Sequence, residues 1–271
     1  MPFPKLLPLL LMAATLLAAI GIGGLFFLKR SGDARANRLY GLLLILGGLT
    51  QLHFALDFGG WLVEYPVLRF LPIYFSLWLP VLLFSHVKIS LYPGYRFRWS
   101  DLKHLSLPIG QTIYFIIVFL FPVFRHEEGR YFYNPFYGGL EQALFLAGWP
   151  LYVLFSALYL RRKRRQLGKR SMPRLIWYLR KLLKGCLLFI LAYAILSGAD
   201  FLAHKFHLAN LRSQVWYAGI QALSFTILLL WLCVYGGQVL VWGRKLIARP
   251  QVQGKGLKAG LTKERQPGGH R

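Results

Sequence analysis

The sequence predicts an all-α membrane protein: a bundle of seven transmembrane helices with its N-terminus outside and its C-terminus in the cytoplasm. Hydrophobic residues make up 56% of the 271-residue chain and charged residues 15%, and the mean hydropathy is +0.46, which is typical of multi-span membrane proteins. Seven apolar runs are each long enough to cross a bilayer as a helix. Lysine and arginine gather in alternate connections between these runs.

The predicted spans together form one transmembrane domain, residues 1–243. They cover residues 6–28, 39–59, 70–90, 105–124, 141–160, 185–203 and 215–242. The first run continues as far as Lys29, so it is longer than the apolar core of a signal peptide and is predicted to stay as a span. Pro72 and Pro80 interrupt the third run, where each removes a backbone N–H donor.

The distribution of basic residues predicts the orientation. The first, third and fifth loops (counting Lys88 with the third) and the C-terminal tail hold 27 of the 33 Lys and Arg, and residues 161–184 alone hold eleven. The N-terminus and the even-numbered loops hold the other 6. Because positive charge beside a span resists translocation, we expect the basic side to be cytoplasmic. Residues 244–271 are basic and rich in glycine, and are predicted to form a disordered cytoplasmic tail.

The second half of the basic stretch is predicted to begin an interfacial helix. Ser171 and Pro173 suit a helix start. One face of this helix would be apolar, formed by Leu175, Ile176, Leu179, Leu182 and Leu183. The lipid bilayer is then the first partner, with anionic lipids attracted to the basic cytoplasmic face.

Several stretches, taken in order, resemble a known family. They are ARANRLYGLLLILGG at the second span, PVLRFLPIYFSLWLPVLLFSHVKISLYPGYRFRWSDLKHL through the third, LRRKRRQL and LIWYLRKLLKG before the sixth, and YGGQVLV near the end of the seventh. Together they resemble the seven-helix N-terminal region of membrane-bound AraC-type transcriptional regulators. The resemblance covers residues 6–250 and implies a multi-pass sensor module in the bacterial inner (cytoplasmic) membrane.

The sequence departs from this family after the last span. Family members continue into a cytoplasmic helix-turn-helix domain, whereas only 29 residues follow Trp242 here. The segment KAGLTKER resembles the start of the family's linker, but the remaining residues are too few for helix-turn-helix units. We therefore expect no direct nucleic-acid binding. The chain would signal to a separate cytoplasmic partner, or would be a truncated regulator without its output domain.

Ionisable side chains within the spans suggest a ligand site, because they are costly in a bilayer. His53 and Asp57 lie four residues apart in the second span, and Asp200 and His204 lie four apart around the end of the sixth, so each pair shares a helix face. The predicted topology places both pairs in the outer half. Two further side chains lie at similar depth: Gln221 and Glu141. The hypothesis is that these six residues bind a small-molecule ligand; the alternative is that they make contacts between helices or with lipid headgroups.

Two His/Asp pairs are also compatible with a metal site. Seven-helix hydrolases of the adiponectin-receptor type use such clusters, but they need a further histidine pair in the last span, which has no histidine here. We therefore expect no metal, no other cofactor and no enzyme activity. The aromatic loop at 131–137 is interpreted either as a lid over the ligand site or as interfacial anchors. Cys186 and Cys233 have no metal-type spacing and are not expected to form a disulfide.

A sensor or receptor-like module is the function that the sequence favours. A small-molecule transporter is the alternative, because intramembrane carboxylates and proline-broken spans also occur in transporters. No repeat relates the two halves of the chain, which favours the sensor. The identity of the ligand, the output partner and the oligomeric state stay open.

Overall fold

A computed structural model describes residues 3–29, 33–92, 94–121, 141–167, 173–206, 211 and 214–247. The regular structure of these residues is helical throughout. Six helices are long and apolar enough to cross a membrane: α1 (Phe3–Leu28), α2 (Ala34–Gly59), α5 (Leu102–Leu120), α7 (Glu141–Leu167), α8 (Pro173–Lys205) and α9 (Val215–Ile247). A shorter apolar helix, α4 (Trp78–Leu91), and the single turns α3 (Trp61–Glu64), η1 (Pro66–Phe70) and η2 (Trp99–Asp101) complete the described fold. These features are those of a helical, multi-pass membrane protein.

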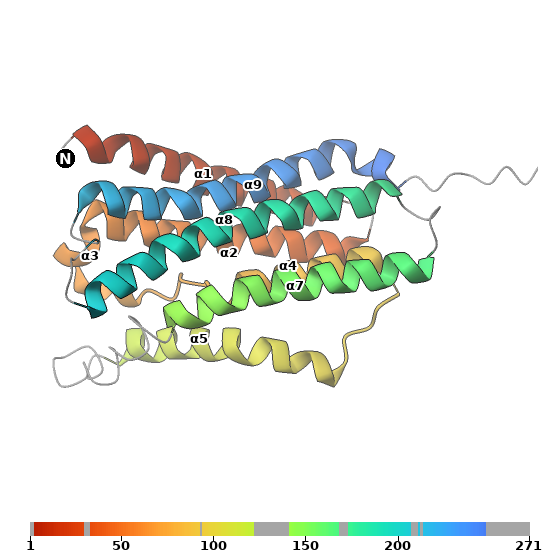
Figure 1. Ribbon diagram of the computed structural model, residues 1–271, viewed down its shortest axis with the longest axis horizontal. Coiled ribbons are helices and arrows are strands. Elements are labelled where there is room, and N and C mark those ends of the chain that lie inside the picture. The colour runs from red at the N-terminus through yellow and green to blue at the C-terminus, as the bar shows by residue number, and fades with distance from the viewer. Residues whose placement is uncertain are drawn as a thin grey trace, which may run out of the picture.

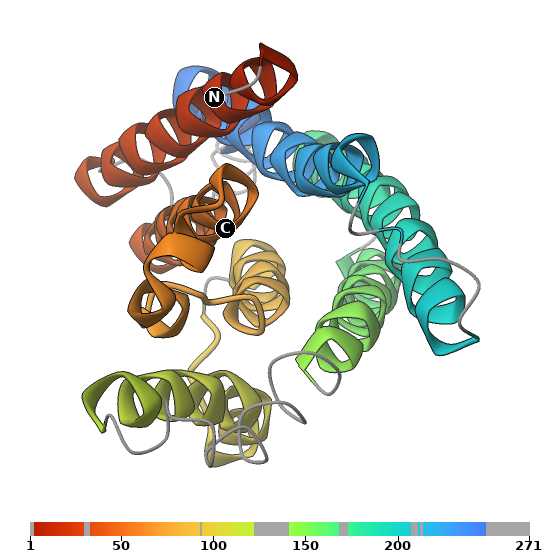
Figure 2. The ribbon, with the colours of Figure 1, turned by 90° about the vertical axis from the view of Figure 1, so that its left-hand side faces the viewer.

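The six long helices and α4 run along the length of the molecule, and each runs opposite to the one before it in the chain (Figure 1). Seen end-on, α1, α9, α8 and α7 form an arc around α2 and α4, and α5 lies at the open side of this arc (Figure 2). The ends of the helices sort into two groups. The end of α1, the end of α4, the end of α7 and the end of α9 lie together, opposite the N-terminus and α3 (Figure 1). The basic segments of the sequence therefore begin at one common end of the bundle, which we call the basic end.

Glycines let α1 and α2 approach closely. A Cβ atom on Gly23 would lie 2.9 Å from the carbonyl oxygen of Gly41, and one on Gly41 would lie 2.7 Å from the carbonyl oxygen of Gly23. Small residues at such crossings bring two backbones into van der Waals contact, which drives helix association in membranes. Next to this crossing, the buried Tyr40 hydroxyl donates a hydrogen bond of 2.6 Å to the Leu232 carbonyl and so joins α2 to α9.

The third predicted span, residues 70–90, is not one continuous helix. Between η1 and α4 the chain is unwound over residues 71–77, which we call the unwound segment. Pro72 accounts for the break, because proline lacks an N–H and disfavours helical geometry in the residue before it. Pro80 lies in the first turn of α4, where a missing N–H leaves no helical bond unmade.

The predicted interfacial helix and the sixth span form a single helix, α8. The face predicted to be apolar is packed inside the bundle, since Ile176, Leu179, Leu182 and Leu183 are all buried. The helix α9 continues past the predicted end of the transmembrane domain to Ile247. The predicted disordered tail beyond residue 247 lies outside the described residues.

Candidate functional site

A group of polar side chains surrounds the unwound segment. The Phe75 N–H donates to Thr50 Oγ1 of α2 at 3.0 Å, and the Leu77 N–H donates to Gln111 Oε1 of α5 at 3.1 Å. The amide nitrogen of Gln111 donates in turn to Ser76 Oγ at 2.8 Å. These side chains supply the hydrogen bonds that a helix would otherwise provide, as buried backbone in a membrane requires.

The polar group continues from α2 towards α9. Gln51 Nε2 donates a buried hydrogen bond of 2.9 Å to Thr226 Oγ1. His53 is only 2% exposed, and its ring centroid lies 4.8 Å from that of Tyr74 in the unwound segment. The inner face of α2 is therefore polar where it meets the unwound segment and α9.

A cavity of about 220 Å³ lies beside the unwound segment, between α5 and the start of α7. Its lining consists of Leu77, Ser106, Leu107, Gly110, Gln111, Tyr114, Phe115 and Leu144. Most of these side chains are apolar, and Gln111, Ser106 and Tyr114 contribute the polar groups. A Cβ atom on Gly110 would meet no atom within 4 Å, so there is open space at this wall. Such a lining suits a small molecule with an apolar body and one hydrogen-bonding group.

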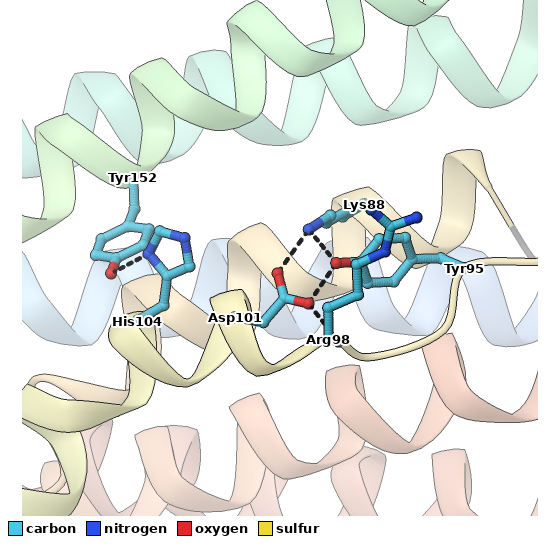
Figure 3. Close-up of polar contacts among 6 residues, drawn as sticks. All are labelled: Lys88, Tyr95, Arg98, Asp101, His104 and Tyr152. Carbon is cyan, nitrogen blue, oxygen red and sulfur yellow. Dashed lines mark hydrogen bonds and ion pairs between the residues drawn. The ribbon is translucent and has the colours of Figure 1, made fainter.

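A second polar cluster lies at the basic end, where α4 turns into α5 (Figure 3). Lys88 Nζ lies 2.9 Å from Asp101 Oδ1 and donates to the Tyr95 hydroxyl at 2.7 Å. Both the Tyr95 hydroxyl and the Arg98 backbone N–H donate to Asp101 Oδ2. Burial by itself would raise the pKa of Asp101, but the hydrogen bonds from Tyr95, the Arg98 N–H and Lys88 outweigh it and lower the pKa to about 2. Asp101 directly precedes α5, so this cluster holds the start of α5 against α4.

Two further hydrogen bonds attach α5 to its neighbours. His104 Nδ1 and the Tyr152 hydroxyl of α7 share a hydrogen bond of 3.0 Å (Figure 3). Trp78 Nε1 of α4 donates to Thr112 Oγ1 at 2.8 Å. Only one face of α5 is buried, formed by Pro108, Gln111, Phe115 and Val118. Polar contacts therefore contribute much of what positions this helix.

The predicted ligand-binding residues lie in different environments in the structure. His53 packs beside the unwound segment, whereas Asp57, one turn further along α2, is exposed. Asp200 is buried on α8, and Gln221 Nε2 donates to Ser197 Oγ of α8 at 3.1 Å. The side chains of His204 and Glu141 lie outside the described residues, and so does the aromatic loop predicted as a lid. His53 contacts the unwound segment through Tyr74.

Sequence reasoning missed the residues that hold the unwound segment. Thr50, Ser76 and Gln111 are uncharged, and single residues of this kind are common in apolar runs. The signal that could have found them is the proline-broken third span. A broken helix frees backbone N–H groups, and the apolar runs beside it then have to supply acceptors.

The described residues contain no group of three or more His, Cys, Asp or Glu side chains arranged to hold a metal ion. Cys186 and Cys233 are buried and free.

Comparisons with protein-family models, with curated proteins and with solved structures each found no match. The resemblance to membrane-bound AraC-type regulators therefore stays a prediction from the sequence.

Proposed function

We propose that this chain is an inner-membrane sensor: a receptor-like module that binds a small molecule beside the unwound segment and transmits its occupancy to a cytoplasmic partner. The observation that carries the proposal is the combination of an unwound segment within an apolar bundle and an adjoining cavity that shares Gln111 and Leu77 with it. Unwound backbone in a bilayer persists only where protein groups or a polar cavity satisfy it. The family resemblance of the sequence also favours a sensing role.

The proposed topology has seven crossings, with the N-terminus outside and the basic end in the cytoplasm. The 27 to 6 division of Lys and Arg supports this orientation. Helix α4 has 14 residues and is about 21 Å long, which is less than the roughly 30 Å of a hydrocarbon core. In the proposed topology the unwound segment completes this crossing, so the ligand site lies in the outer half of the bilayer.

The proposed ligand is small and amphipathic. The cavity of about 220 Å³ is smaller than the roughly 300–1,000 Å³ of sites for drug-sized ligands. Its apolar walls would take the body of the ligand, and Gln111 would accept or donate a hydrogen bond at one end. A ligand that engages the Gln111 amide competes with Leu77 and Ser76 for it, and so changes how the unwound segment is held.

Helix α5 is the proposed route from the ligand site to the cytoplasm. Gln111 lies in the middle of α5, and the cluster of Lys88, Tyr95 and Asp101 joins the start of the same helix to α4 at the basic end. A shift of α5 would therefore move this cluster, which in the proposed topology lies at the surface that faces the cytoplasmic partner. We propose no enzymatic activity for this chain.

A thermal-stability screen tests the ligand site. Purified protein is exposed to small molecules that have an apolar body and one hydrogen-bonding group, and melting temperatures are compared. We expect a hit to stabilise the wild type and the control Ser224→Ala, whose hydroxyl bonds a carbonyl of its own helix, but not Gln111→Met. Equal stabilisation of Gln111→Met would place binding elsewhere and refute this site.

Reporter fusions test the topology separately. A fusion after Gln166 is expected to report a cytoplasmic location, and one after Tyr133 an external location. The reverse result would invert the topology and move the cavity to the inner half of the bilayer.

A transporter is the second candidate, and the unwound segment is the observation that favours it, because transporters bind substrates at broken helices. Proteoliposomes distinguish the two functions. A ligand that stabilises the protein but is not taken up supports the sensor, whereas protein-dependent uptake that Gln111→Met abolishes would establish transport.

A further inference from the structure

A groove with a cationic rim lies between the basic first half of α8 and the middle of α9. Its volume is about 440 Å³. The rim carries the side chains of Arg180, Lys181 and Lys184, and Trp177 stands beside them with Lys181 Nζ 5.5 Å from its ring centroid. We call this feature the α8–α9 groove.

The floor of the α8–α9 groove is formed by the indole ring of Trp231, which packs against the backbone of α8 at Gly185. A Cβ atom on Gly185 would lie only 2.2 Å from the Trp231 ring, so glycine is what lets α9 place tryptophan there. Trp231 Nε1 donates to the Leu182 carbonyl at 3.3 Å, which fixes the ring. The floor is therefore a defined apolar surface, with a polar atom already engaged by α8.

No acidic residue lies close in the sequence to Arg180, Lys181 and Lys184. Asp200 is the only acidic residue between Glu141 and Glu264, and it lies ten or more residues from the groove along α8. The ion pairs Arg35–Asp33 and Lys88–Asp101 both use acidic groups at other helix ends. Three positive charges at the rim therefore favour an anion that comes from outside the chain.

An exposed apolar stripe continues from the rim into the membrane-crossing part of α8. Leu188, Leu191 and Ile195 are 64%, 47% and 72% exposed. From Lys184 to Ile195 the helix rises about 16 Å, which is close to half of the roughly 30 Å hydrocarbon core. The cationic rim and the stripe are thus spaced like the headgroup and one acyl chain of a lipid in a single leaflet.

We propose that the α8–α9 groove binds one anionic phospholipid. Its phosphate lies among Arg180, Lys181 and Lys184, its glycerol region lies against the Trp231 ring, and an acyl chain follows the apolar stripe. Basic pockets between membrane helices bind anionic headgroups in this way. The inference depends on membrane insertion alone and is independent of the proposed sensor function, its ligand and its output.

Native mass spectrometry of the detergent-purified full chain, titrated with defined lipids, tests this site. The probes are dioleoylphosphatidylglycerol, dioleoylphosphatidylcholine and inorganic phosphate. The test variant is R180Q/K181Q/K184Q. The matched control is R161Q/R162Q/R165Q, which removes the same charge from exposed positions on α7 at the same end of the bundle. If the triple variant does not fold, the single variant Lys184→Gln is titrated in its place.

We expect one phosphatidylglycerol to bind the wild type and the α7 control with similar affinity. The α8 triple variant is expected to lose roughly 10- to 100-fold in affinity, and Lys184→Gln roughly fivefold, as for basic groups near anionic lipid. An equal loss in the α7 control would show that only the overall charge attracts lipid. Equal binding of phosphatidylcholine, or displacement of phosphatidylglycerol by inorganic phosphate at equal concentration, would also overturn the proposal.

Discussion

The two sides of this bundle are held together by different means. Eleven residues of α2 are buried, and its crossing with α1 brings glycine backbones into contact. Four residues of α5 are buried, and α5 is joined to its neighbours by hydrogen bonds and by one ion pair at Asp101, directly before its start. Lipid tails are as apolar as leucine, so helices in a membrane associate through close packing and polar contacts rather than through the hydrophobic effect. In the proposed function, the α1–α2 side is therefore the rigid scaffold and α5 is the helix that the ligand displaces.

The largest expected effect is at the glycine crossing. Gly41→Ala places a Cβ atom 2.7 Å from the Gly23 carbonyl oxygen, so one helix must move, and we expect a loss of about 3 kcal/mol in the free energy of unfolding. Gly21→Ala, whose Cβ would meet no atom within 4 Å, is the matched control and should change stability by less than about 1 kcal/mol. Unfolding by sodium dodecyl sulfate measures both. Equal effects would mean that the crossing is not close-packed.

The next largest effect is expected where α5 supplies a hydrogen-bond acceptor to the unwound segment. Gln111→Met keeps the length of the side chain but leaves the Leu77 N–H without its acceptor, and we expect a loss of about 2 kcal/mol. Ser106→Ala, which removes only a bond to a carbonyl of the same helix, is the control and should be nearly neutral. Hydrogen exchange should report faster exchange at Leu77 in Gln111→Met alone. Unchanged exchange there would show that α5 does not support the segment.

A smaller effect is expected at the cluster that joins α4 to α5. Asp101→Asn weakens the contact with Lys88 at 2.9 Å, and we expect a loss of about 1.5 kcal/mol near pH 7. The matched control is Asp57→Asn, which changes an exposed carboxylate near the other end of α2. Increased proteolysis between α4 and α5 should accompany the loss in Asp101→Asn only.

The pH dependence of the same variant sharpens this test. The pKa of Asp101 is lowered from 3.8 to about 2 in the folded protein, so its contribution to stability is fully present above about pH 4 and is lost as the pH falls through 2. The difference in stability between wild type and Asp101→Asn should therefore shrink between pH 4 and pH 2. A difference that stays constant over this range would contradict the proposed role of the ionised carboxylate.

The smallest effect is expected where α5 meets α7. Tyr152→Phe removes the hydroxyl that shares a 3.0 Å hydrogen bond with His104, and such bonds in membrane proteins contribute about 0.6 kcal/mol on average. Its control is Tyr178→Phe, which removes a hydroxyl bonded to Gln238 on the other side of the bundle. If α5 is the movable helix, Tyr152→Phe should alter ligand-induced stabilisation and Tyr178→Phe should not.

Hydrophobic run length predicted the helices better than it predicted their boundaries. The start of α7 and the start of α9 agree with the predicted spans, whereas α8 begins twelve residues before the predicted sixth span. The extra turns of α8 carry lysine and arginine, which lower the local hydropathy although leucine and isoleucine still line a buried face. Helical periodicity also did not predict which member of a polar pair is buried. It places His53 and Asp57 on one face of α2, but α2 ends near Asp57, so His53 is buried and Asp57 is exposed.

That this chain is helical and apolar enough to cross a membrane, and where its positive charge gathers, could be predicted from its sequence, because these properties follow from composition along the chain. Tertiary structure alone decided which polar residues act together. The acceptors of the unwound segment come from Thr50 and Gln111, which are 25 and 34 residues away from their donors. A hydrogen bond depends on the distance between two groups in space. The periodicity of one helix shows which residues share a face, but not which neighbouring helix packs against that face.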